Sequence, residues 1–118
     1  MPESALSIVI PVRNDAVNLA ACLAALRRAT VQPLDLIVVD DASVEDVSPI
    51  VSDAGARYLR LPRQMGPATA RNTGGRATAG EIVLFVDSDI VVPPDAIGRL
   101  LEIFRLRPEL TGSIRFER

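Results

Sequence analysis

Residues 80–89 read Gly-Glu-Ile-Val-Leu-Phe-Val-Asp-Ser-Asp. The apolar run 82–86 is typical of a strand that is covered on both faces, and such strands belong to parallel sheets. Asp87 and Asp89 follow at once, at the end of a strand where open parallel sheets bind their ligands. This stretch therefore predicts a parallel α/β sheet with an acidic site beyond one strand.

Three more apolar runs precede it, at residues 6–10, 34–39 and 57–61, with a spacing of about 25 residues that suits β–α units. The run 57–61 alternates in polarity, which indicates an edge strand. Between the runs lie helical patterns, such as the apolar positions Leu19, Cys22, Leu23 and Leu26. We expect one α/β domain over residues 1–118, with a mainly parallel sheet of about four strands flanked by helices. Residues 113–117 alternate and are compatible with the start of a further strand.

The segment 66–80 predicts an unusual helix, opened by Gly66-Pro67 and closed by Gly80. It contains almost nothing bulky, and Gly74 and Gly75 in its interior each cost about 1 kcal/mol relative to alanine. Two interpretations fit. The helix packs closely on the sheet, or a ligand also approaches the backbone at its N-terminus.

Composition removes several kinds of chemistry. The chain has 118 residues and no histidine, and all 13 of its basic residues are arginine. A serine–histidine triad, an imidazole metal ligand and a P-loop lysine are thereby excluded. The lone Cys22, on an apolar helix face, is expected in the core. The remaining carboxylates, hydroxyls and amides suit a hard cation with oxygen ligands.

Carboxylates follow two of the predicted strands. Asp87 and Asp89 lie two residues apart, so both can face one Mg²⁺ or Mn²⁺ ion that keeps room for phosphate oxygens. The pair Asp40-Asp41 follows another strand. Either the first caps a turn and the second is solvated, or an acid here accepts hydrogen bonds from a ribose hydroxyl or a base imide.

Two arginines are further candidates for this site. Arg13 is either an ordinary surface charge or a planar guanidinium that stacks on a base or binds phosphate. Arg71 lies one turn into the small-residue helix, where it is either solvent-facing or a diphosphate partner beside the positive helix end.

Four segments, taken in order and spacing, resemble the successive motifs of family-2 glycosyltransferases. They are residues 7–15 (SIVIPVRND), 37–43 (IVVDDAS), 66–72 (GPATARN) and 80–89 (GEIVLFVDSD). The resemblance implies a Rossmann-like GT-A fold, a nucleotide-diphosphate sugar donor with UDP-sugar preferred over GDP-sugar, a Mg²⁺ or Mn²⁺ ion, and inverting transfer by direct displacement. The family usually has an aromatic residue where Arg13 stands, so base stacking here would depend on a guanidinium.

The resemblance also implies roles for matching positions. The nucleoside pocket would be lined by Pro11, Arg13 and Asp41. Arg71 would lie near the base and diphosphate, and Asp87 near the ribose, the sugar and the metal, which Asp89 would hold. In this family the base that deprotonates the acceptor follows the Asp-x-Asp motif in a second half. We therefore expect the nucleotide-sugar-binding half, truncated after that motif, and we assign no catalytic residue.

The remaining expectations concern surroundings. No apolar run approaches the ~18–20 residues of a membrane span, and the acidic balance disfavours nucleic acid. A cytoplasmic protein is expected. In the family's sheet the side of the strand at 82–86 continues into the second half, so an unpaired edge or apolar surface should be exposed on that side and favour a homo-oligomer. A non-catalytic nucleotide-binding or self-assembling module of the same fold is the alternative function.

Overall fold

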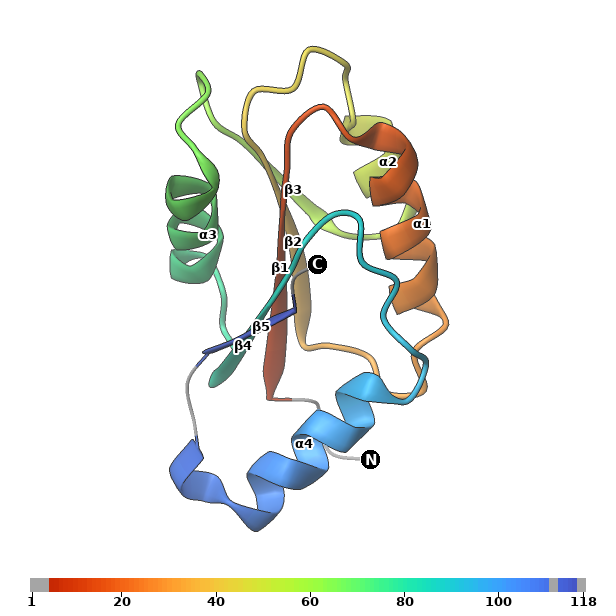
Figure 1. Cartoon of the computed structure of the whole chain (residues 1–118), viewed down its shortest axis with the longest axis vertical. Helices are drawn as coiled ribbons and strands as arrows, with labels where there is room; N and C mark the ends of the chain where they lie inside the picture. The colour runs from red at the N-terminus through yellow and green to blue at the C-terminus, as the bar shows by residue number, and fades with distance from the viewer. Residues whose placement is uncertain (1–4, 111–112, 117–118) are drawn as a thin grey trace.

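The apolar runs form one parallel sheet (Figure 1). The computed structural model describes residues 5–110 and 113–116. The strands are β1 (Leu6–Val12), β2 (Asp35–Asp40), β3 (Arg57–Arg60), β4 (Ile82–Val86) and β5 (Ser113–Phe116). Their order is β3-β2-β1-β4-β5, and every neighbouring pair is parallel. The predicted α/β class is confirmed, and the sheet has five strands where about four were expected. The additional strand, β5, covers most of the alternating segment 113–117. Glu117 lies outside the described residues.

The two edge strands of the sheet are β3 and β5. β3 is an edge strand, as its alternating sequence predicts. β4 is not an edge, because β5 pairs with it from Val83 to Val86. The edge strand on the β4 side of the sheet is therefore β5 and not β4 itself, because this short parallel strand pairs with the backbone groups of β4. Self-association through a sheet edge stays a prediction.

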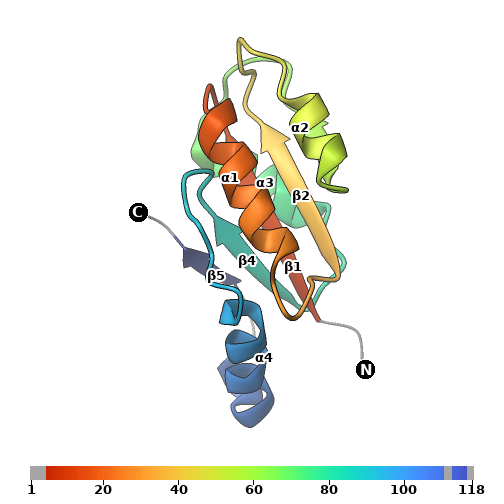
Figure 2. The same cartoon turned by 90° about the vertical axis from the view of Figure 1, so that its right-hand side faces the viewer.

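Helices cover both faces of the sheet (Figures 1 and 2). α1 (Ala16–Arg27) and α2 (Ser48–Asp53) lie on one face, and α3 (Pro67–Arg76) lies on the other. α4 (Ala96–Leu106) lies beyond the amino ends of the central strands, and a short 3-10 helix (Pro108–Leu110) follows it. Among the described residues, no helix has the length and apolar character to cross a membrane.

The two faces carry cores of different size. Because side chains alternate along a strand, Ile8 and Ile10 point to one face and Val9 to the other. The first face packs against α1, and the predicted stripe Leu19, Cys22, Leu23 and Leu26 is fully buried there. Among the residues whose burial is described, the core of the α3 face consists of Val9, Ile37, Val39, Leu61 and Ala70.

α3 packs closely on the sheet, as the first interpretation of its small residues predicts. A Cβ atom at Gly74 would overlap the Cγ1 methyl of Val9 and lie 3.0 Å from Cγ2 of Val39. The helix ends at Arg76, earlier than predicted from Gly80. The Gly80 amide instead donates to Ser7 Oγ at 2.8 Å, which fixes the chain at the entrance to β4. α3 thus lies directly on β1 and β2.

Candidate nucleotide-diphosphate site

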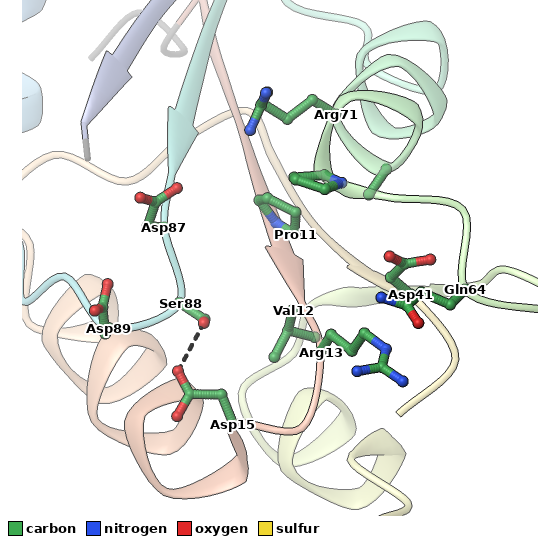
Figure 3. A pocket seen from close by; sticks show the side chains of 12 residues that line it. Pro11, Val12, Arg13, Asp15, Asp41, Gln64, Arg71, Asp87, Ser88 and Asp89 are labelled. Atoms are coloured by element: carbon green, nitrogen blue, oxygen red, sulfur yellow. Dashed lines mark hydrogen bonds between the residues drawn. The ribbon is translucent and has the colours of Figure 1, made fainter. Parts of the chain in front are cut away.

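A pocket of about 310 Å³ opens at the carboxyl ends of the strands (Figure 3). The strand order reverses between β1 and β4, and ligands of open parallel sheets bind at such a switch point. The pocket is lined by Pro11, Val12, Arg13, Asp15, Asp41, Gln64, Pro67, Ala70, Arg71, Asp87, Ser88 and Asp89. Its volume lies within the range of small-ligand sites.

One side of the pocket is acidic. Asp87, Ser88 and Asp89 follow β4, and Asp15 faces them from the turn after β1 (Figure 3). The Ser88 hydroxyl donates to Asp15 Oδ2 at 2.9 Å, which ties the two turns together. Asp15 is the N-cap residue of α1, but its side chain makes no capping bond to the helix backbone; its Oδ1 accepts the Asn18 side-chain amide at 2.9 Å. The Asp15 carboxylate therefore lies at the rim of the pocket, where it bonds Ser88.

Cys22 supports the acidic side from below. Its thiol is fully buried in α1 and contacts the carbonyl oxygen of Asp87 at 3.9 Å. Burial, with the nearby charge of Asp89 as a second cause, raises the pKa of Cys22 to about 12. The thiol therefore stays protonated and packs as a core residue, as its apolar surroundings in the sequence predict.

The opposite side holds Arg13, Asp41 and Gln64 (Figure 3). Asp41 is only 4% exposed, so it is not the solvated residue that one interpretation of the sequence allowed. Its two carboxylate oxygens accept the backbone amides of Met65 at 2.7 Å and Gly66 at 3.0 Å. Each oxygen retains a second lone pair, so Asp41 holds the loop before α3 and can still accept a bond from a ligand.

The N-terminus of α3 closes the pocket between these sides. Gly66 takes a φ of +95°, and Pro67 follows it in the first turn of α3. Pro67, Ala70 and Arg71 of this helix line the pocket, and the Arg71 side chain lies above Pro11 of β1 in Figure 3. A positive helix end and a guanidinium therefore reach the site from the same element.

The pocket offers oxygen ligands of the kind that a divalent ion needs. The described residues contain no group of three or more acidic, histidine or cysteine side chains able to enclose a metal. Asp87 and Asp89 supply carboxylate oxygens at the pocket wall. Two carboxylates with room for phosphate oxygens and water suit Mg²⁺ or Mn²⁺ better than a closed protein cage. The residues present therefore fit a metal shared with a diphosphate.

Every predicted site residue lines this one pocket. They are Pro11, Arg13, Asp41, Arg71, Asp87 and Asp89. Two further lining residues have no role assigned from the sequence: Gln64 lies in the polar loop after an edge strand, and Asp15 ends the motif segment 7–15. The position of Asp15, two residues after Arg13 in the turn at the end of a buried strand, is the signal that points to the pocket.

The fold and its pocket define a class: this is a GT-A glycosyltransferase fold with an Asp-x-Asp at the switch point. The chain belongs to Glycosyl transferase family 2, whose family model matches residues 7–116. The resemblance noted in the sequence is thereby confirmed.

Similar proteins agree with this assignment. An undecaprenyl-phosphate 4-deoxy-4-formamido-L-arabinose transferase of Serratia proteamaculans is 30% identical over 99% of this chain and 39% of its own length. S. aureus TarS, solved with UDP-GlcNAc, superposes with a TM-score of 0.81 over 87% of this chain and 32% of that one, at 23% identity. The mannosyltransferase PcManGT of Pyrobaculum calidifontis, solved with GDP-Man and Mn²⁺, has a TM-score of 0.80 at 22% identity, over 88% and 33%. This chain thus spans about a third to two-fifths of the matched chains, of which the TarS chain comprises residues 1–349.

Proposed function

We propose that this chain binds a nucleotide-diphosphate sugar through a divalent metal, as the donor site of an inverting glycosyltransferase. The observation that carries the proposal is the single pocket in which an acidic wall, two arginines and a helix N-terminus meet at the switch point. A UDP-sugar is the preferred donor and a GDP-sugar the alternative, in line with the nucleotides named for TarS and PcManGT.

The two sides of the pocket suggest how the donor lies. Asp87 and Asp89 would hold Mg²⁺ or Mn²⁺, which neutralises diphosphate charge and eases departure of the leaving group when it is bound. Arg71 and the N-terminus of α3 attract the same diphosphate. Pro11, Arg13 and Asp41 would then face the nucleoside, with the Arg13 guanidinium as the stacking surface and Asp41 as an acceptor for the base imide.

Direct displacement at the anomeric carbon also needs a base that takes the proton of the acceptor. We assign no such base among the pocket residues, because the acidic ones are committed to metal, loop or turn contacts in this proposal. For the chain of 118 residues, the proposed function is therefore donor binding, with weak or no sugar transfer.

Thermal unfolding with UDP, GDP and ADP, each with Mn²⁺, Mg²⁺ or no metal, tests the proposal. A nucleotide at about 100 times its dissociation constant should stabilise the fold by about 2.7 kcal/mol, and only when metal is present. Asp89→Asn should abolish the metal-dependent stabilisation by the nucleotide. Arg71→Gln should weaken binding about tenfold through loss of one phosphate contact.

Matched controls exist on neighbouring surface positions. Arg76→Gln removes an exposed arginine from the same helix as Arg71, and Asp53→Asn removes an exposed carboxylate at the end of α2. Neither residue lines the pocket, so neither change should alter nucleotide binding. No stabilisation by any nucleotide, or equal stabilisation of Asp89→Asn, would refute donor binding through a metal.

A further inference from the structure

A charged cluster lies at the ends of β2 and β3, outside the lining of the pocket. We call Asp40, Ser43, Tyr58 and Arg60 the Asp40 cluster. The Asp40 side chain is fully buried, and its Oδ1 accepts the backbone amide of Ser43 at 2.8 Å. Its Oδ2 accepts the Tyr58 hydroxyl at 2.5 Å and the Arg60 guanidinium at 2.9 Å. Two residues of edge strand β3 therefore hydrogen-bond the last residue of β2.

Asp40 carries its charge at neutral pH. Burial raises the pKa of its carboxyl, but hydrogen bonds from Ser43 and Tyr58, together with the Arg60 charge, outweigh burial and hold the pKa below its usual value. A fixed anion can accept several strong hydrogen bonds at once. The cluster is thus a rigid anchor for the groups bonded to it.

The cluster connects to the turn that carries Arg13. Ser43 Oγ, which also bonds Asp40, accepts the backbone amide of Asn14 at 3.0 Å. In return, Asn14 Oδ1 accepts the amide of Val44 at 2.8 Å. Arg60 donates a second bond, at 3.1 Å, to the carbonyl oxygen of Ser43. The turns after β1 and β2 are therefore linked to each other through Ser43.

Both turns need such support, because each contains a strained residue. Asn14 has a φ of +53° and Ala42 a φ of +58°, in the left-handed region that Ala in particular disfavours. Backbone strain of this kind persists only where surrounding contacts fix it. Arg13 and Asp15 flank Asn14, and Asp41 precedes Ala42, so three lining residues depend on these two conformations.

We propose that Asp40, held by Tyr58 and Arg60, is a positioning residue that fixes Arg13 and Asp41 in the geometry that receives the nucleoside; this rests on the proposed function. None of the Asp40 cluster lines the pocket, so it acts through the two turns. If loosening the cluster leaves the turns in the receptive geometry a tenth of the time, the apparent dissociation constant rises about tenfold.

Tyr58→Phe and Arg60→Gln test this, since each removes donors from a partly exposed side chain without emptying the core. The matched control is Arg57→Gln, on the same strand, whose guanidinium donates to Ala77 O near the end of α3 instead. Titration calorimetry with UDP or GDP and Mn²⁺ should give about tenfold weaker binding for both variants and unchanged binding for the control. Amide hydrogen exchange at Asn14 and Val44 should accelerate in the variants only.

Arg60→Lys supplies a partial rescue. An ammonium can restore the ion pair with Asp40, but it lacks the fork that also reaches Ser43 O, so binding should lie between wild type and Arg60→Gln. Variants that bind as tightly as wild type, with unchanged exchange at Asn14, overturn this inference alone. A wild-type chain that binds no nucleotide overturns the proposed function and this inference with it.

Discussion

The two faces of the sheet are built differently. The face under α1 buries large side chains such as Leu19, Leu23 and Leu26, with α2 and α4 completing the layer. The face under α3 buries few side chains, and Gly74 brings the helix backbone close to Val9. One face supplies apolar burial, which dominates folding stability. The other face lets the backbone of α3 lie close to β1 and β2.

Close approach matters for the pocket. Because α3 lies low on the sheet, its first turn reaches the ends of β1 and β2, and Pro67, Ala70 and Arg71 line the site. A helix with leucines at the Gly74 and Ala70 positions would stand further from the sheet. The small residues of α3 therefore place a helix end at the pocket, while the α1 face supplies most of the buried apolar core.

The strongest way to break this comparison is Leu23→Ala on the α1 face. Leu23 is 2% exposed, and truncating such a leucine leaves a cavity that costs about 2–5 kcal/mol of the free energy of unfolding. Urea denaturation measures the loss. Nucleotide affinity, measured where the variant is still folded, should not change.

Val17→Ala is the matched control on the same helix. Val17 is 84% exposed, so its truncation should change the free energy of unfolding by less than about 0.5 kcal/mol. Equal losses from Leu23→Ala and Val17→Ala would contradict the assignment of the α1 face as the main stabilising core.

Gly74→Ala on the α3 face should have the second largest effect. Alanine favours the helix by about 1 kcal/mol, but its Cβ would overlap Val9 Cγ1, and overpacking of this kind typically costs about 1–3 kcal/mol. We expect a net loss of stability together with weaker nucleotide binding, because α3 is displaced from the strand ends. Denaturation and calorimetry on the same variant measure both effects.

The Val9→Ala change sharpens this test. It removes the methyl groups that the new Cβ would meet, so the double variant should lose less stability than the sum of the two single variants. Stability losses that simply add in the double variant would show that the contact between position 74 and Val9 does not set the distance of α3 from the sheet.

Gly75→Ala, one residue further along α3, should have the smallest effect and the opposite sign. Its Cβ would lie 3.6 Å from Phe85 Cζ, an ordinary contact, so the helix gains about 0.5–1 kcal/mol from lower backbone entropy in the unfolded chain. Denaturation should show stabilisation with unchanged nucleotide affinity. A destabilised Gly75→Ala variant would show that the whole of α3, and not one position, is tightly packed.

Much of the fold follows from local patterns. The apolar runs and the helical stripe predict β1 to β4 and α1 because periodicity reports which faces are buried. The end of α3 was predicted too late, because the bond from Gly80 to Ser7 Oγ joins residues far apart in the sequence. The pairing of β5 with β4 is equally non-local, and it makes β5 the edge strand on that side of the sheet.

Sequence patterns alone are enough to predict the parallel α/β class, the family and six residues that line the pocket, because these side chains lie at the ends of buried strands or near the start of a helix. Only the tertiary structure decided how they are held. Asp41 is occupied by two loop amides, Asp15 meets Ser88, and Asp40 is locked by two residues of β3. These bonds join distant segments, and their geometry depends on strand order and helix height, which no local pattern encodes.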